Sequence, residues 1–428
     1  MTRSTAALAV GVLTVGFAVP AASADQIRDQ QWALKMFEAE AKVWPVSQGD
    51  GVVVAVIDTG VSQDQPDLTG QVLPGADFSG GGSDGRVDSD GHGTGMAGLI
   101  AGHGHGSQAG VMGLAPKAKI LPVKVVTGSD DPGSQPTPDP QRNDFADAIR
   151  FAADHGAKVA NISLGGNYRL DSKLRKAVNY AVSKDVVLVA STGNSGSGFG
   201  AEYPAAFPGV VAVGAVDSNG AVWERSTSGI ETTLAAPGVG IYRSSPKSST
   251  GYERRNGTSD STAYVSATAA LIRSKYPNLS AGQVINRMIK SATPPADGSA
   301  VPNSQYGYGI VAPAKALEAN PTVDGGPRDN PLLARKESLG TPPTDEETDE
   351  PSAEAMVPKG DSDGGPSTSS AIGVGVGVAI GLTLWALPIG GVVLVVVLVM
   401  RARRRKRAAA AEAYQPPYQQ PPYGGSYQ

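Results

Sequence analysis

Residues 157–192 read AKVANISLGGNYRLDSKLRKAVNYAVSKDVVLVAST, and this stretch decides the fold class. Two short apolar runs, AKVANIS and VVLVAST, stand on either side of a segment with helical spacing, SKLRKAVNYAVSKD. A strand, a crossover helix and a second strand form the repeating unit of a parallel sheet. Strands that are apolar throughout are typical of sheets buried on both faces. The stretch therefore predicts an α/β fold.

The same alternation extends from residue 51 to about residue 320. Three more apolar runs, GVVVAVID, AKILPVKVV and VVAVGAV, predict buried strands, and DFADAIRFAADHGA predicts another helix. We expect a doubly wound parallel sheet with helices on both faces, in a domain long enough to bury a sizeable core. In such sheets, functional residues gather beyond the carboxyl ends of the strands.

The two ends of the chain predict export and a membrane anchor. Residues 1–24 contain a basic residue, an apolar stretch and a final A-x-A signal, which together predict a cleaved signal peptide. Residues 371–400 carry no charge and exceed the roughly 20 residues that span a bilayer, so we predict one transmembrane helix. Six positive charges follow within residues 401–407 and predict a cytoplasmic tail by the positive-inside rule.

Residues 25–50, between the signal peptide and the first strand, predict an amphipathic helix that packs on the main domain. The apolar positions recur at three- and four-residue spacings: Ala33, Met36, Phe37, Ala41 and Trp44. This N-terminal extension is too short to form an independent domain.

Three polar segments lie outside the predicted strands and helices. Residues 321–370 are rich in Pro, Gly, Ser and acidic side chains and predict a flexible, extended linker. Residues 401–428 are basic and then rich in Tyr and Pro, which is typical of a low-complexity tail. Residues 127–144 interrupt one strand-to-helix connection, either as a substrate or partner loop or as a surface insert.

Composition excludes several classes of function. The formal net charge is −4 and no basic patch precedes residue 401, so no nucleic-acid partner is expected. The chain has no cysteine, which excludes a thiol nucleophile and cysteine metal sites. His103 and His105 are either a metal-binding pair or histidines of a surface turn. No acidic loop of EF-hand type supports calcium, and we predict no metal and no cofactor.

Three separated segments carry residues that suit nucleophilic catalysis. VAVIDTGV ends a strand with Asp58, DGHGTGMAGLIAG places His92 at the start of a helix of small residues, and GTSDSTAYVSATAALI places Ser259 at the start of another. A carboxylate, an imidazole and a hydroxyl are the parts of a Ser-His-Asp triad. Each residue alone has a structural explanation, as a helix cap for Asp58 or Ser259 or a turn histidine for His92.

Taken together and in this order, the three segments resemble the subtilisin-like serine proteases, the subtilases of peptidase family S8. The resemblance runs from about residue 45 to 320 and implies a subtilisin-like peptidase domain over residues 51–320. It implies that the chain is a serine endopeptidase acting on polypeptides. Asp58 would orient the imidazole, His92 would act as the base, and Ser259, which matches the family's G-T-S, would attack the scissile carbonyl.

Two further segments match the family. VVLVASTGNSG ends a strand with Asn194, at the position of the family's oxyanion-hole asparagine. Its amide and the Ser259 backbone N–H, at a helix N-terminus, would stabilise the developing oxyanion. The segment NISLGG resembles the substrate-binding strand, so Ser163, Leu164 and Gly165 would line the groove and pair with an extended peptide.

The chain departs from the family pattern beside the predicted site. Gly95 stands where a second histidine is usual, and Ser261 and Ala263 replace the small residue and the proline that usually follow the nucleophile. None of these changes removes a group that transfers a proton, so we expect catalysis to survive. The glycine-rich walls at residues 163–166 and 191–194 suggest that no charged group guards the entrance to the substrate site.

The arrangement of the segments resembles the mycosins, the membrane-anchored subtilases of actinobacterial type VII secretion systems. The resemblance rests on the signal peptide, the short extension, the acidic linker and the single C-terminal span. It implies a protease at the cell membrane, with its catalytic domain outside and in association with a secretion complex. Mycosins often carry disulfides, whereas this chain has no cysteine. As an alternative, the chain is a scaffold subunit of that complex and cleavage is dispensable.

Overall fold

The computed structural model describes residues 26–106, 109–126, 144–197, 200–246 and 251–337. The predicted signal peptide, the transmembrane span, the cytoplasmic tail and nearly all of the 127–144 loop lie outside these residues. In the described ranges, no helix is both long enough and apolar enough to cross a membrane.

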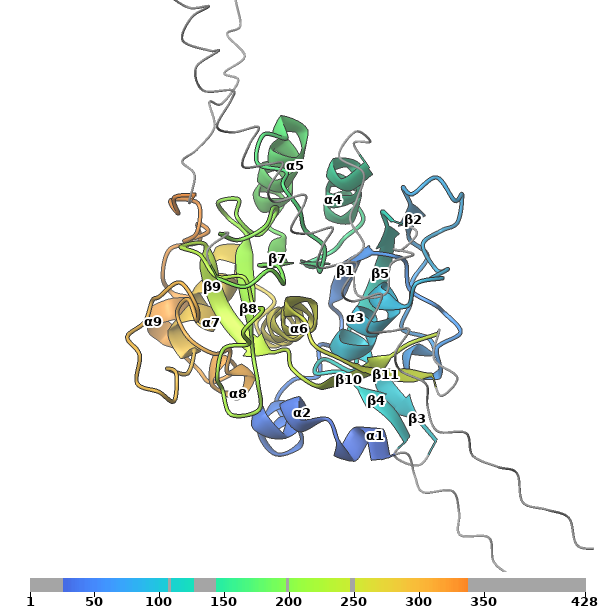
Figure 1. Ribbon diagram of the computed structural model, residues 1–428, viewed down its shortest axis with the longest axis horizontal. Helices are drawn as coiled ribbons and strands as arrows, with labels where there is room; N and C mark the ends of the chain where they lie inside the picture. The colour runs from blue at the N-terminus through green and yellow to red at the C-terminus, as the bar shows by residue number, and fades with distance from the viewer. Residues whose placement is uncertain (1–25, 107–108, 127–143, 198–199, 247–250, 338–428) are drawn as a thin grey trace, which may run out of the picture. The chain divides into compact units, whose positions relative to one another are not determined.

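A seven-stranded sheet forms the centre of the fold, in the order β2-β5-β1-β6-β7-β8-β9 (Figure 1). Every neighbouring pair of strands is parallel. The strands are β1 (Val53–Asp58), β2 (Ala76–Asp77), β5 (Lys119–Lys124), β6 (Val159–Ile162), β7 (Val187–Ser191), β8 (Val211–Val216) and β9 (Thr232–Pro237). The five strands expected from apolar runs are all present, which confirms the predicted parallel α/β fold.

Helices cover both faces of this sheet because its strands are apolar on both sides. In β1, Val54 and Val56 belong to one buried cluster, whereas Ala55 and Ile57 belong to another. Successive side chains of a strand point to opposite faces, so the two clusters are the two sides of the sheet. The first cluster contains residues of α3 (His92–Ala101), α6 (Thr258–Lys275) and α7 (Ala281–Ser291), and the second contains residues of α4 (Asp144–Asp154) and α5 (Ser172–Ser183).

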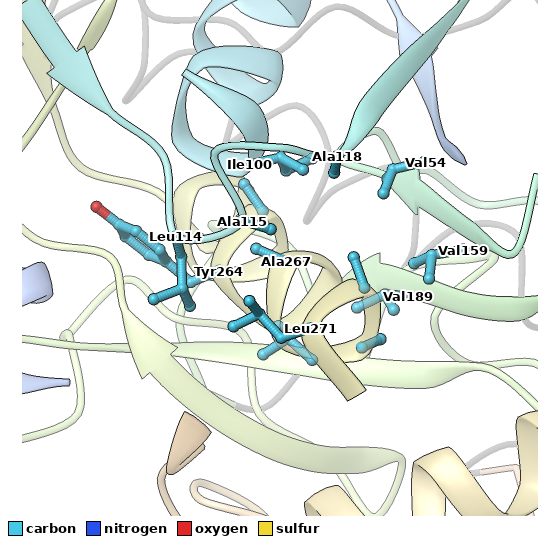
Figure 2. Close-up of a cluster of buried hydrophobic side chains, with 14 of the residues drawn as sticks. Val54, Ile100, Leu114, Ala115, Ala118, Val159, Val189, Tyr264, Ala267 and Leu271 are labelled. Atoms are coloured by element: carbon cyan, nitrogen blue, oxygen red, sulfur yellow. The ribbon is translucent and has the colours of Figure 1, made fainter. Parts of the chain in front are cut away.

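The helix α6 lies at the centre of the first cluster. Figure 2 shows its Ala267 and Leu271 among side chains that include Val54, Val159 and Val189 of the sheet. Its residues from Thr258 to Arg273 are all buried. A helix that is buried all round must fit closely against its neighbours, and the small residues of this one allow that.

The remaining elements lie around the sheet. Two antiparallel hairpins pair β3 (His103–His105) with β4 (Ala109–Met112) and β10 (Ile241–Ser244) with β11 (Tyr252–Arg255). Outside the N-terminal extension, further short helical turns are η2 (Pro66–Leu68), α8 (Pro313–Ala316) and α9 (Pro321–Asp324).

The N-terminal extension is not the single amphipathic helix that the sequence predicts. It forms α1 (Gln26–Asp29), α2 (Trp32–Met36) and a π-helical turn, η1 (Ala39–Val43). Glu38 has a left-handed backbone (φ 52°) and interrupts the helical path, so Met36 and Ala41 are exposed. The indole groups of Trp32 and Trp44 donate hydrogen bonds to the carbonyls of Val239 and Leu114. Of the five apolar positions expected to face the domain, Ala33, Phe37 and Trp44 do pack against its core, whereas Met36 and Ala41 do not.

Residues 321–337, expected to begin the flexible linker, pack on the α/β domain instead. Glu337 is buried and accepts two hydrogen bonds from Arg175, at 2.7 and 3.1 Å. Arg335 donates to five acceptors: the carbonyl oxygens of Ala205, Phe207, Val210 and Glu231 and the hydroxyl of Thr233. The prediction of a flexible linker was wrong for these residues. It rested on their polar composition, and charged side chains usually face water, whereas Arg335 and Glu337 have buried partners.

Replacing Arg335 by Met is therefore expected to destabilise the domain. Methionine keeps an apolar side chain of similar length but removes a donor from four buried carbonyl oxygens, of which only those of Phe207 and Glu231 keep a second donor among the described residues. The loss costs about 3–5 kcal/mol in total. In a domain of this size, such a loss lowers the melting temperature by roughly 10 °C. Thermal unfolding followed by circular dichroism measures it. The exposed Arg328→Met variant is the control, and equal melting temperatures for both variants would contradict the assignment.

Candidate active site

Asp58 ends β1 at the carboxyl edge of the sheet and is fully buried. One of its carboxylate oxygens, Oδ1, accepts hydrogen bonds from the backbone N–H of Thr59 at 2.8 Å and from His92 Nδ1 at 2.7 Å. The structure therefore brings two of the predicted site residues into direct contact. Because Asp58 accepts at Nδ1, the proton of the neutral imidazole is held on that nitrogen.

His92 is the first residue of α3, and glycines on both sides allow the chain to turn there. Gly91 has a left-handed backbone (φ 95°), and Gly93 packs so closely on the carbonyl of Gly60 that any side chain would collide with it. His92 Nε2 is buried and has no hydrogen-bond partner among the described residues. This nitrogen is thus available to accept a proton.

A buried carboxylate that sequence reasoning missed, Asp88, holds this turn in place. It accepts hydrogen bonds from the hydroxyl of Thr59, the backbone N–H of Gly91 and both the backbone N–H and the hydroxyl of Thr94. Burial raises the pKa of the Asp88 carboxyl. The signal was present in the sequence DSDGHGT, because Asp and Ser before a Gly commonly form such side-chain-to-backbone turns.

Ser259 lies in the first turn of α6, and β6 fixes its position. The Ser259 hydroxyl donates to the carbonyl of Ser163 at 3.2 Å, and the Ser163 hydroxyl donates to the carbonyl of Ser259 at 3.1 Å. Asn161 of β6 extends the connection, because its amide donates to Ser163 and accepts from Ser266 of α6. The structure does not bring Ser259 into a hydrogen bond with His92. Hydrogen bonds of this kind are often loose in enzymes without substrate.

Asn194 lies beyond β7, at the same edge of the sheet. Its side-chain oxygen Oδ1 accepts hydrogen bonds from the backbone N–H and the hydroxyl of Thr258, both at 3.0 Å. This bonding leaves the amide Nδ2 as a donor. The amide Nδ2 lies 3.9 Å from the point that a Cβ on Gly257 would occupy, next to the start of α6. Asn194 and the N-terminus of α6 therefore lie side by side.

The predicted substrate strand, Ser163 to Gly165, follows β6 directly. Ser163 and Leu164 are buried, and the Leu164 side chain belongs to the apolar cluster that contains α4 and α5. Only the backbone of Leu164 is therefore available to a peptide. Gly166 and Tyr203 exchange two backbone hydrogen bonds, so the segment around Tyr203 runs beside this strand.

The departure at Gly95 has a structural explanation that the sequence did not reveal. A Cβ on Gly95 would lie 2.7 Å from Cδ of Arg243, so the absence of a side chain leaves room for that arginine. Arg243 is buried and bonds Glu253 at 2.9 Å and Asp260 at 3.3 Å. An arginine, with two acidic partners, thus lies beside α3 where the family usually has a histidine.

The other two departures are also accommodated by packing. The Ser261 hydroxyl donates to the carbonyls of Ala236 at 2.9 Å and Pro237 at 3.1 Å. Ala263 is fully buried in the cluster around α6. Both residues thus support the position of α6.

Several charges act on the pKa of His92. Burial, the largest contribution, lowers it, but the charge and the hydrogen bond of Asp58 raise it, and the net pKa of His92 is raised above 6.5. Arg243 lowers the pKa of His92 and Asp260 raises it, so these two charges oppose each other. Burial in turn raises the pKa of the Asp260 carboxyl.

The raised pKa of His92 predicts the pH dependence of a reaction in which it acts as a base. Below that pKa the imidazole is protonated and cannot accept a proton, so kcat/KM should fall as the pH decreases, with its midpoint above pH 6.5. Rates between pH 5 and 9 on a peptide without ionisable groups measure this. A midpoint below pH 6.5 would mean that burial dominates.

The described residues hold no group of three or more side chains suited to a metal ion. His103 and His105 have separate partners: His103 Nε2 lies 2.9 Å from the carbonyl oxygen of Thr69, and His105 Nδ1 lies 2.6 Å from a carboxylate oxygen of Asp67. The two histidines therefore connect β3 to the segment of residues 67–69 at η2.

Comparisons with known proteins agree with this geometry. Residues 49–309 match the model of the Subtilase family. Subtilisin DY of Bacillus licheniformis is 36% identical over 301 residues, which are 70% of this chain and 97% of that protein. Thermitase of Thermoactinomyces vulgaris is 39% identical over 241 residues, which are 55% of this chain and 79% of that protein.

Two solved structures have similar folds. The crystal structure of MycP1 from Mycobacterium smegmatis has a TM-score of 0.60 and 29% identity, and the match covers 73% of this chain and 90% of that one. The structure of the MycP3 protease from the type VII (ESX-3) secretion system has a TM-score of 0.57 and 33% identity, over 70% of this chain and 90% of that one.

Proposed function

The chain belongs to the subtilase family, whose members are serine endopeptidases, and on this premise we propose that Asp58, His92 and Ser259 hydrolyse peptide bonds through an acyl-enzyme. The observation that supports it most is the 2.7 Å contact of His92 Nδ1 with Asp58, which leaves His92 Nε2 buried, without a partner in the described ranges and able to act as a base.

In the proposed reaction, His92 Nε2 takes the proton of the Ser259 hydroxyl as Ser259 Oγ attacks the scissile carbonyl. The Asp58 carboxylate stabilises the imidazolium that forms. The developing oxyanion accepts hydrogen bonds from Asn194 Nδ2 and from the Ser259 backbone N–H at the start of α6. His92 then gives the proton to the leaving amine, and a water molecule activated by the same imidazole hydrolyses the acyl-enzyme.

Substrate binding has one further requirement. In the structure, the Ser259 hydroxyl donates its single proton to the carbonyl of Ser163. It cannot donate to that carbonyl and to His92 at once. We therefore expect the hydroxyl to turn from Ser163 to His92 Nε2 as the peptide pairs with the backbone of Ser163 to Gly165.

Hydrolysis of an internally quenched peptide library by the purified full-length chain tests the proposal. The wild type should cleave peptides and lose activity with a sulfonyl fluoride, whereas His92→Ala should cleave none. His155→Ala, which changes an exposed histidine at the end of α4, is the matched control. A correctly folded wild type without cleavage, or equal cleavage by His92→Ala, would contradict the proposal.

We propose that this protease is exported and held by one C-terminal span, with the segment boundaries predicted from the sequence except that the domain continues to residue 337. The absence of cysteine allows a clean test by single substitutions. Ser367→Cys should react with a membrane-impermeant maleimide in intact cells, and Ser426→Cys only after permeabilisation. Equal labelling of both positions in intact cells would contradict this topology.

Association with a type VII secretion complex is the proposed setting, and it is supported by the similarity to MycP1 and MycP3. The same similarity supports the alternative of a scaffold subunit. A strain without this chain distinguishes the two roles when it receives either the wild type or His92→Ala. Secretion restored by both proteins would favour the scaffold, whereas secretion restored by the wild type alone would favour the protease.

A further inference from the structure

Glu202 is held by backbone hydrogen bonds between the two walls of the proposed substrate site. Its backbone N–H donates to the carbonyl of Thr192, beyond β7, at 2.9 Å. The next residue, Tyr203, exchanges hydrogen bonds of 3.0 and 3.1 Å with Gly166, beyond β6. Residue 202 is thus tied to the segments that carry Asn194 on one side and the substrate strand on the other.

The Glu202 carboxylate lies against two glycines of these walls. Its Oε2 is 2.6 Å from the point that a Cβ on Gly165 would occupy, and its Oε1 is 2.6 Å from the corresponding point on Gly193. A side chain at either glycine would collide with the carboxylate unless Glu202 moved. The glycine-rich walls suggested that no charged group guards the entrance to the substrate site, and they did not reveal this carboxylate, which comes from a later part of the chain.

The Glu202 carboxylate lacks a counter-charge among the described residues. It is half-buried and makes no hydrogen bond or ion pair with any other residue that the structure describes. Burial raises the pKa of the Glu202 carboxyl. Removing a carboxylate from water without a compensating partner is unfavourable. A positively charged group of a ligand that pairs with Glu202 would therefore offset the desolvation free energy of this carboxylate.

The position of Glu202 relative to Ser259 and Asn194 indicates which substrate residue would supply the positive charge. Gly193 precedes Asn194, whose amide is proposed to hold the oxygen of the scissile carbonyl, and Gly165 lies on the strand proposed to hold the substrate backbone. The side chain that lies between these two contacts is that of the residue contributing the scissile carbonyl. Lys and Arg are long enough to carry their charge past the glycines to a carboxylate.

We propose that Glu202 is the specificity-determining residue of this protease and selects Lys or Arg as the residue that contributes the scissile carbonyl. This inference rests on the proposed function of Ser259 and Asn194. It assigns to the enzyme a class of substrate, polypeptides cleaved after a basic residue. The glycines at positions 165 and 193 are then required because they leave room for both the carboxylate and its cationic ligand.

Internally quenched peptides that differ only at this residue test the inference with the full-length chain. Arg and Lys peptides should have kcat/KM values at least about 100-fold above those of the Gln and Leu peptides. Glu202→Gln, which keeps the shape and removes the charge, should lower the Arg and Lys values by about 100-fold and leave the others within a few-fold. Glu318→Gln, the same change at an exposed position, should leave all four values unchanged.

A fluorophosphonate probe that carries no such side chain separates this inference from the proposed function. Wild type and Glu202→Gln should react with the probe at equal rates, because the probe contacts only the reacting groups. Probe labelling without a preference for Arg and Lys would overturn the inference and leave the proposed function standing. An equal loss on all peptides in Glu202→Gln would also overturn it, since that result indicates a general structural role. Absence of both labelling and cleavage would overturn the two proposals together.

Discussion

Ser259→Ala should lower kcat for peptide hydrolysis by about 10⁶-fold, the magnitude known for subtilisin, a relative of this chain. The substitution removes a hydroxyl that lies at the start of α6 and is placed against the substrate strand through Ser163. The loss should appear in kcat with little change in KM, because the hydroxyl acts in the chemical step. Single-turnover rates with a quenched peptide measure it.

The neighbouring serine provides a matched control. The Ser261 hydroxyl is bonded to the carbonyls of Ala236 and Pro237, so Ser261→Ala should cost about 1 kcal/mol of stability and leave kcat within a few-fold. If Ser259→Ala kept most of the activity and Ser261→Ala lost it, Ser261 would be the nucleophile and the proposed roles would be wrong.

Asp58→Asn should lower kcat by about 10⁴-fold. The asparagine side chain fits the same space, but its amide can donate to His92 Nδ1. The imidazole would then carry its proton on Nε2 and could no longer accept one from Ser259. The melting temperature should change far less than the rate, since the packing around β1 remains.

The pH profile distinguishes this account from a general loss of structure. The charge of Asp58 raises the pKa of His92, so the acid limb of the residual kcat/KM should move to lower pH in Asp58→Asn. Asp154→Asn, an exposed carboxylate bonded to Tyr180, is the control. An unchanged acid limb with a large loss of rate would show that Asp58 does not act on His92 in solution.

Local sequence patterns predicted five strands of the central sheet and the contact between Asp58 and His92. The buried strands β1, β5, β6, β7 and β8 are mostly apolar runs, and such runs predict buried strands of a parallel sheet. The strand β9 begins with two threonines and has no such run, so only its pairing with β8 makes it recognisable. The contact of Asp58 with His92 was predictable because both lie in short motifs at strand and helix ends.

Features that depend on distant partners were not predictable in this way. Arg243 fills the space beside Gly95, although 147 residues separate them in the chain, and neither residue carries a local signal for the contact. Arg335 and Glu337 looked like linker residues because their composition is polar, and only their buried partners make them part of the domain. Glu202 lies in an ordinary loop sequence, and its importance depends on two glycines from other segments.

Mass spectrometry of the full-length protein after reaction with a fluorophosphonate probe tests the central claim most directly. The proposed site predicts a single covalent adduct on the peptide that contains Ser259, and no adduct in the His92→Ala variant. An adduct on Ser163 or Ser261, or no adduct on a protein shown to be folded, would contradict the claim that Asp58, His92 and Ser259 work together.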